Sequence, residues 1–143
     1  MRIVKDDLKK IIIEGNTRVL VEKSQEFGSD LAKDLKRKDQ RGREKVEISK
    51  LTTSQIRNFF GTVKKIEAKE FDKAGEREFL LLKPKLAYAA KKAGKTKLTD
   101  LKEVLTDSID LVTSEEGNKQ EKFNRFCDLF EALLCYHKAS GGN

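Results

Sequence analysis

Apolar residues recur every three or four positions along most of the chain, which is the spacing of amphipathic helices, and no segment keeps the alternation of a half-buried strand. The clearest helix start is at Thr52, whose hydroxyl can accept a free N–H of the first turn, while Gln55 can close a capping box. Leu51 and Ile56 have the spacing of a hydrophobic staple. We predict a helix over about 53–72 with a buried stripe of Ile56, Phe59, Phe60, Val63 and Ile66.

Similar patterns predict an all-α fold, a compact bundle of five to six helices forming a single domain over residues 1–143. We expect one helix over about 5–14 and a second from residue 16 or 17 that carries Leu35 inward and is weakened at Gly28. A later helix should reach Ala93, with Pro84 either kinking it or starting it, and two more should follow from about 99 and 119. Residues 36–50 read as a charged flexible loop without strands, and 140–143 as a frayed tail.

Charge is unevenly distributed along the chain, whose net charge is +7. Residues 83–97 contain six lysines and no acid, whereas residues 98–121 contain seven acids and two lysines. Such a two-sided chain suits a protein with one nucleic-acid face and one protein or solvent face. The alternative is that lysine-rich helices only keep the domain in solution.

The sequence shows no combination of residues typical of a catalytic site. His137 is the single histidine, and it continues an apolar stripe as a partly buried helix-end residue. Cys127 and Cys135 are about 12 Å apart along one helix, too far to bridge, and read as small core residues. We therefore expect no active site, no metal and no cofactor. No signal peptide or membrane span is apparent, so we expect a cytoplasmic protein.

Binding is better supported, because cations fall on defined helix faces. Arg57 lies roughly 100° from Ile56, beside the buried stripe, and shares its side with Gly61 and Lys64, whereas Lys65 and Lys69 point further round and read as solvated. A second stripe, within roughly 80°, joins Lys85, Tyr88, Lys92 and Lys95. Cations neutralise phosphates and a ring can stack on a base, although Tyr88 could instead fill the core. Further RNA-binding candidates are Lys83, Arg41, Arg43, Arg125 and Lys138.

Three blocks, in this order, carry a family resemblance: TTSQIRN at residues 52–58, LKPKLAYAAKK at 82–92 and FNRFCDLFEALLCYHK at 123–138. From Lys50 to the C-terminus the chain resembles the small subunit of the type III-A CRISPR–Cas effector (Csm) complex. The resemblance implies an all-helical, non-catalytic subunit of an antiviral ribonucleoprotein. Its partners would be guide RNA, the paired target RNA, other subunits and copies of itself in a filament, while target cleavage, DNA cleavage and cyclic-oligoadenylate synthesis belong to other subunits.

Two other functions remain open on the sequence. A helix-turn-helix DNA-binding protein could use TTSQIR to open a recognition helix, but that motif needs a preceding helix after a turn of about three or four residues. A pure helical scaffold would bind no nucleic acid. Because a subunit that stacks in a filament exposes apolar patches, we expect self-association, such as a homodimer, when the chain is isolated. The sequence assigns no role to the acidic segment 98–121.

Overall fold

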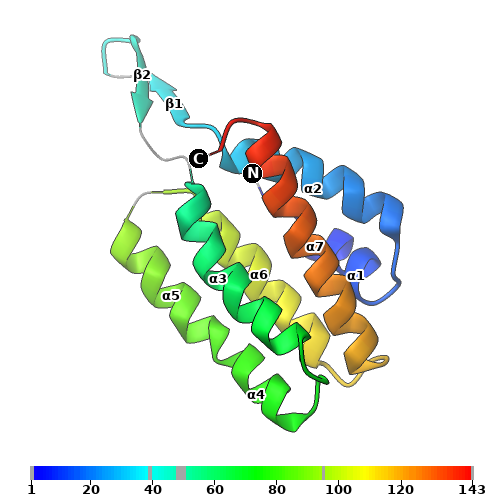
Figure 1. Cartoon of the computed structure of the whole chain (residues 1–143). Coiled ribbons are helices and arrows are strands. Elements are labelled where there is room, and N and C mark those ends of the chain that lie inside the picture. The colour runs from blue at the N-terminus through cyan, green and yellow to red at the C-terminus, as the bar shows by residue number, and fades with distance from the viewer. Residues whose placement is uncertain (1, 39, 48–50, 95, 143) are drawn as a thin grey trace.

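The fold is a single bundle of α-helices, as predicted. The computed structural model describes residues 2–38, 40–47, 51–94 and 96–142, and Figure 1 shows the arrangement of their helices. In these ranges the helices are α1 (Lys5–Ile12), α2 (Thr17–Leu31), α3 (Thr53–Glu67), α4 (Lys73–Leu80), α5 (Leu82–Ala93), α6 (Leu98–Thr113) and α7 (Lys119–Ala139). Only Leu81 separates α4 from α5, so the helix expected to reach Ala93 is built as two pieces.

Two short strands occupy the segment that the sequence predicted to be a loop. β1 (Leu35–Lys38) pairs antiparallel with β2 (Glu44–Glu47), with Leu35 opposite Glu47, and the hairpin projects from one end of the bundle (Figure 1). The prediction of no strands is therefore wrong for this segment, and Leu35 starts a strand instead of extending α2. Each strand contains a single apolar residue, so neither shows the alternating pattern of a half-buried strand. Residues 48–50 of the predicted loop lie outside the described residues.

Side-chain caps mark the starts of α2, α3, α4 and α7. Thr52 and Gln55 form the predicted capping box: the Gln55 N–H donates to Thr52 Oγ1 at 3.4 Å, and the Thr52 N–H donates to Gln55 Oε1 at 2.9 Å. Leu51 and Ile56 of the predicted staple are both buried. Helix α3 ends at Glu67, earlier than predicted, because the chain turns and Asp72 caps α4 by accepting from the Gly75 N–H at 2.9 Å.

Helix α7 runs through the centre of the core, and its aromatic side chains are buried as predicted. Phe123 and Phe126 pack edge-on against Phe79 of α4, with ring centroids 5.2 and 4.8 Å apart. On the α3 side, Phe130 meets Phe60 at 5.3 Å. These contacts fix α3 and α4 against α7.

The opposite side of α7 packs closely on α2 at Gly28, a contact that the sequence did not predict. A Cβ added at Gly28 would lie 2.8 Å from Tyr136 Cβ and 3.0 Å from the Leu133 carbonyl oxygen. Real Cβ atoms do not approach so closely, so only glycine lets the two helix backbones meet here. Gly28 is thus a packing residue of α2, and not simply a weak point.

The C-terminal end of α7 is hydrogen-bonded to Leu51, just before α3. His137 is fully buried, not partly buried as predicted, and its Nε2 lies 2.5 Å from the carbonyl oxygen of Leu51. Cys127 is buried, whereas Cys135 is exposed, which corrects the expectation that both thiols belong to the core. The sequence could not predict the His137 contact, because its two partners are 86 positions apart.

Candidate nucleic-acid interface

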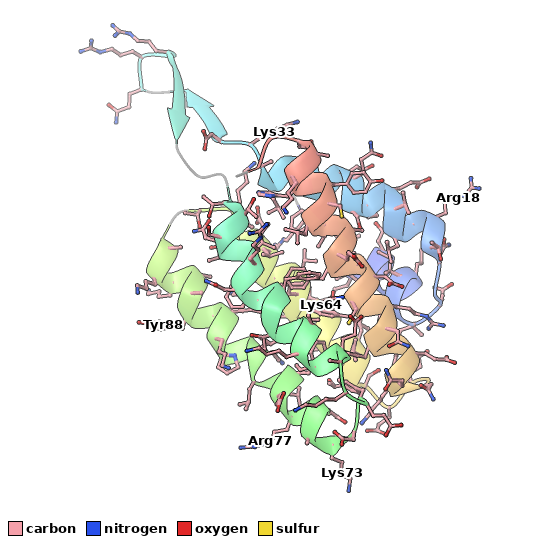
Figure 2. The ribbon with its side chains drawn as sticks, viewed as in Figure 1. Arg18, Lys33, Lys64, Lys73, Arg77 and Tyr88 are labelled. Atoms are coloured by element: carbon pink, nitrogen blue, oxygen red, sulfur yellow. The ribbon has the colours of Figure 1, made fainter. Side chains whose placement is uncertain are left out.

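The outer stripe of α5 combines exposed cations with an exposed ring. Leu82, Leu86 and Ala90 are the buried residues of α5, so the stripe of Lys85, Tyr88 and Lys92 lies on the solvent side. Tyr88 is 70% exposed and points away from the bundle (Figure 2), so its ring is not core filler. Among the described residues neither lysine has an ion-pair or hydrogen-bond partner. We call Lys85, Tyr88 and Lys92 the α5 stripe.

Two other predicted cations are held by carboxylates. Lys83 Nζ lies 2.6 Å from Asp110 Oδ1 of α6, and Lys64 Nζ lies 2.7 Å from Glu67 Oε1 one turn along α3. The hydrogen bond with Glu67 raises the pKa of Lys64, and the same bond lowers the pKa of Glu67. A phosphate would have to displace a carboxylate at either lysine, whereas the α5 stripe requires no such exchange.

The cations Arg57 and Lys64 of α3 lie on the side of that helix that faces α7, unlike the cations of α5. Lys64 Nζ lies 5.6 Å from the centroid of the Phe60 ring, which itself packs against Phe130 of α7. Lys64 therefore lies on the α7 side of α3, and Arg57, roughly 20° away round the helix, shares that side. Lys65 lies a further 100° or so round α3, away from α7. Arg57 is exposed and has no partner within the described part of the chain.

Arg125, another predicted RNA contact, closes the end of α1 instead. Its Nη1 donates to the carbonyl oxygens of Ile12 and Ile13, each at 3.1 Å. Its guanidinium also packs over Gly15, where an added Cβ would lie 2.9 Å from Nε. These interactions satisfy carbonyls that a helix end leaves free. Sequence reasoning missed this role because the partners are more than a hundred positions apart.

The remaining candidates are spread over the molecule. Arg41 and Arg43 are exposed in the turn of the hairpin and each already interacts with another group of the chain. Lys138 is exposed on the last turn of α7. Lys95 lies outside the described residues.

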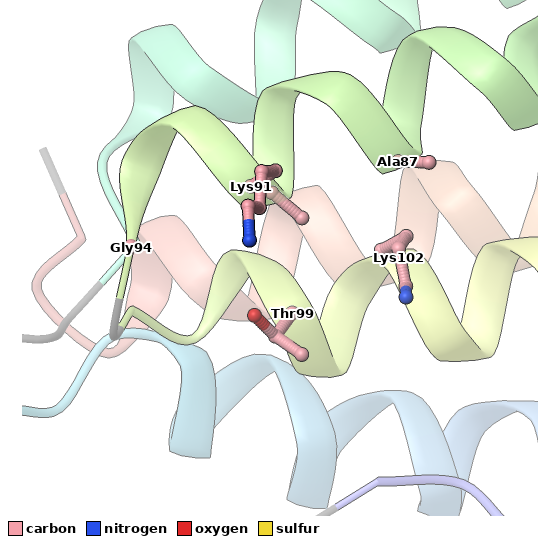
Figure 3. Close-up of a pocket in the computed structure, with 6 residues that line it drawn as sticks. Ala87, Lys91, Gly94, Thr99 and Lys102 are labelled. Carbon is pink, nitrogen blue, oxygen red and sulfur yellow. The ribbon is translucent and has the colours of Figure 1, made fainter.

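A shallow basic depression lies between α5 and α6, beside the α5 stripe. Its volume is about 430 Å³, and its lining combines small residues with two lysines and a hydroxyl: Ala87, Ala90, Lys91, Gly94, Thr99 and Lys102 (Figure 3). Lys102 is already paired with Glu103 at 3.0 Å. The depression therefore adds Lys91 as a further cation next to the stripe, which sequence reasoning had not placed there.

The described residues can be compared with the requirements of a metal site and of a reactive thiol. Within residues 2–38, 40–47, 51–94 and 96–142, no cluster of three His, Cys, Asp or Glu side chains could hold a metal ion. Burial is the main factor that raises the pKa of the Cys127 thiol, so this thiol is held in its unreactive protonated form. In the same ranges no helix is long and apolar enough to cross a membrane.

Comparison with known proteins identifies the family. The family model described as Csm2 Type III-A matches residues 30–143. The chain belongs to this family. No curated protein and no solved structure gives a significant match. Membership confirms the resemblance to the small Csm subunit and extends it to positions before Lys50. This Csm2-family chain is accordingly a structural subunit of the type III-A CRISPR effector complex, with partners inside that complex.

The structure contradicts a helix-turn-helix reading of this Csm2-family chain. Helix α2 ends at Leu31 and α3 begins at Thr53, and the β1–β2 hairpin lies between them. A recognition helix would need a preceding helix joined to it by a few residues. The capping box of α3 therefore starts a core helix.

Acidic side chains of segment 98–121 form ion pairs with nearby basic side chains of the subunit. Its helix α6 packs against α5 and α1, where Glu103 lies 3.5 Å from Arg2 and 3.0 Å from Lys102. The hydrogen bond from Lys102 lowers the pKa of Glu103. Together with the ion pair between Lys83 and Asp110, these contacts engage two acids of α6, and the Asp110 pair joins α6 to α5.

Proposed function

We propose that this Csm2-family subunit grips the RNA backbone through the α5 stripe, as a non-catalytic part of the effector complex. The guide RNA and its paired target RNA would be the ligands, and Arg57 would add a contact on α3. The observation that carries the proposal is that Lys85, Tyr88 and Lys92 are exposed and unpaired, while Lys64, Lys83 and Arg125 are engaged within the protein.

The stripe has a spacing that suits a strand of nucleic acid. Lys85 and Lys92 are separated by two helical turns, about 10 Å along the axis, and Tyr88 lies between them. Two ammonium groups can bind separate phosphates while the ring stacks on a base or ribose. None of these groups must read a base edge, so the grip is independent of sequence, as a subunit that serves any guide requires.

The test reverses the two lysines in the assembled effector complex. Lys85→Glu combined with Lys92→Glu should weaken the retention of every target RNA about equally. The log–log salt slope should flatten by roughly 1 to 1.5, because two phosphate contacts on a single strand are lost. Retention is measured by filter binding across about 50–300 mM salt.

A matched control separates the stripe from charge in general. Arg18→Glu combined with Lys33→Glu makes the same charge change on the α2 side of the bundle, where both side chains are exposed (Figure 2). This control should hold RNA normally. If the α5 variant also holds target RNA normally across the salt range, the RNA face lies elsewhere. If both variants lose RNA alike, only net charge matters and the α5 stripe has no special role.

A further inference from the structure

An apolar patch with a cationic rim lies on α4, outside the α5 stripe. Leu80 and Leu81 are 38% and 44% exposed, although both are large apolar side chains. They line an open groove together with Lys73, Glu76 and Arg77. We call Lys73, Arg77, Leu80 and Leu81 the α4 patch.

The packing of α4 on the bundle does not depend on Leu80 and Leu81. Helix α4 is anchored by the neighbouring Phe79, which is fully buried and packs against Phe123 and Phe126 of α7. Within the described chain Val4, Val21 and Tyr88 are the other large apolar or aromatic residues of comparable exposure, and none of them is next to another in sequence. Leu80 and Leu81 line the same groove and so form a continuous apolar surface, which is typical of a protein contact.

The charges around the groove define its partner. Lys73 and Arg77 are exposed one turn apart and have no acidic partner among the described residues. The acid that lines the groove, Glu76, is paired with Lys119 of α7, whose Nζ lies 3.2 Å from Glu76 Oε1. This hydrogen bond raises the pKa of Lys119. Figure 2 shows Lys73 and Arg77 pointing away from the bundle at the end opposite the hairpin. The groove therefore presents two free positive charges beside an apolar strip.

We propose that the α4 patch docks an acidic amphipathic helix of another subunit of the effector complex. The apolar face of that helix would cover Leu80 and Leu81, and two carboxylates one turn apart would pair with Lys73 and Arg77. A protein fits this surface better than RNA does, because leucine side chains offer no ring for a base to stack on. The proposal rests on membership of the complex and is independent of the RNA contact proposed for α5.

The first experiment measures assembly. Leu80→Ser combined with Leu81→Ser should lower the fraction of this subunit that co-purifies with a tagged second subunit by roughly five- to tenfold, as a loss of apolar contacts at an interface centre would. Val4→Ser combined with Val21→Ser is the matched control, since these valines are 59% and 43% exposed, and it should assemble normally. Circular dichroism verifies that both variants fold. Equal assembly of the two folded variants would overturn the proposal.

The second experiment identifies the occupant directly. Leu81 is replaced by the photo-crosslinker p-benzoylphenylalanine in the assembled complex, and the adduct is sequenced. A crosslink to a segment of another subunit with acids beside apolar residues supports the proposal. A crosslink to RNA, a crosslink to a second copy of this chain, or the absence of any crosslink overturns it. Lys92→Glu, at the end of the α5 stripe away from Leu81, should leave the crosslink in place, so failure of the RNA proposal and failure of this one give different results.

Discussion

Replacing Gly28 with alanine tests the close contact between α2 and α7. The residue lies in the interior of α2, where it faces α7. Taken alone, Gly→Ala in a helix interior stabilises by about 0.8–1 kcal/mol, because glycine loses more backbone entropy on folding. Sequence reasoning would therefore expect Gly28→Ala to stabilise the protein. The structure gives the opposite expectation.

The new methyl carbon would lie 2.8 Å from Tyr136 Cβ, 3.0 Å from the Leu133 oxygen and 3.2 Å from the His137 nitrogen. Two of these atoms belong to the backbone of α7, so the strain cannot be relieved by turning a flexible side chain. The helices must separate, and overpacking of this kind costs about 1–3 kcal/mol. After the helix-propensity gain is subtracted, we expect Gly28→Ala to lower the free energy of unfolding by roughly 0–2 kcal/mol.

Gly61 provides the matched control, because it too is an interior helix residue but an added Cβ would meet nothing within 4 Å. Gly61→Ala should raise the free energy of unfolding by roughly 0.5–1 kcal/mol. Urea denaturation followed by circular dichroism measures both variants, at several protein concentrations to detect self-association. If Gly28→Ala is as stable as Gly61→Ala, α2 and α7 do not meet as closely as described, and our account of Gly28 is wrong.

Two further variants or conditions test the assignments of single side chains. Arg125→Ala should lower the free energy of unfolding by roughly 1–2 kcal/mol, because the carbonyl groups of Ile12 and Ile13 lose their donor. Target RNA retention in the complex should not change. If the variant loses RNA without losing stability, Arg125 belongs to the RNA interface. Iodoacetamide at about pH 8.5 should alkylate the exposed Cys135 and spare Cys127 until the protein unfolds, because a raised pKa keeps the buried thiol protonated there. Peptide mapping that finds Cys127 labelled in the native protein would contradict its burial.

Features encoded by neighbouring residues were predictable. The capping box of Thr52 and Gln55 and the staple of Leu51 and Ile56 span only a few positions; the structure forms the capping box and buries both staple residues. The aromatic stripe of α7 was likewise visible as a repeat. The β1–β2 hairpin was not, because each strand contains a single apolar residue and its pairing depends on residues six to twelve positions apart, from Lys38 with Glu44 to Leu35 with Glu47.

The site was harder to predict than the fold, since a helical wheel gives the angle between residues but not the neighbour that each angle faces. Lys83 and Arg125 looked free on the sequence, yet their partners lie 27 and more than a hundred positions away. By helical geometry Arg57 and Lys64 share one side of α3. That this side borders α7 depends on the packing of Phe60 against Phe130. Only tertiary contacts of this kind distinguish an engaged cation from an available one.

The break between α4 and α5 brings the two proposed surfaces into contact with each other. Leu81 keeps helical backbone angles at the junction, so it lies within roughly 60° of Lys85, Tyr88 and Lys92 when viewed down α5. The α4 patch thus runs directly into the α5 stripe, and Lys85 lies one turn from Leu81. The acidic partner proposed for the α4 patch would approach Lys85 more closely than Lys92, and its carboxylates would compete with phosphates for Lys85. Lys92 is therefore the position where the RNA contact can be tested without disturbing the docking of the other subunit.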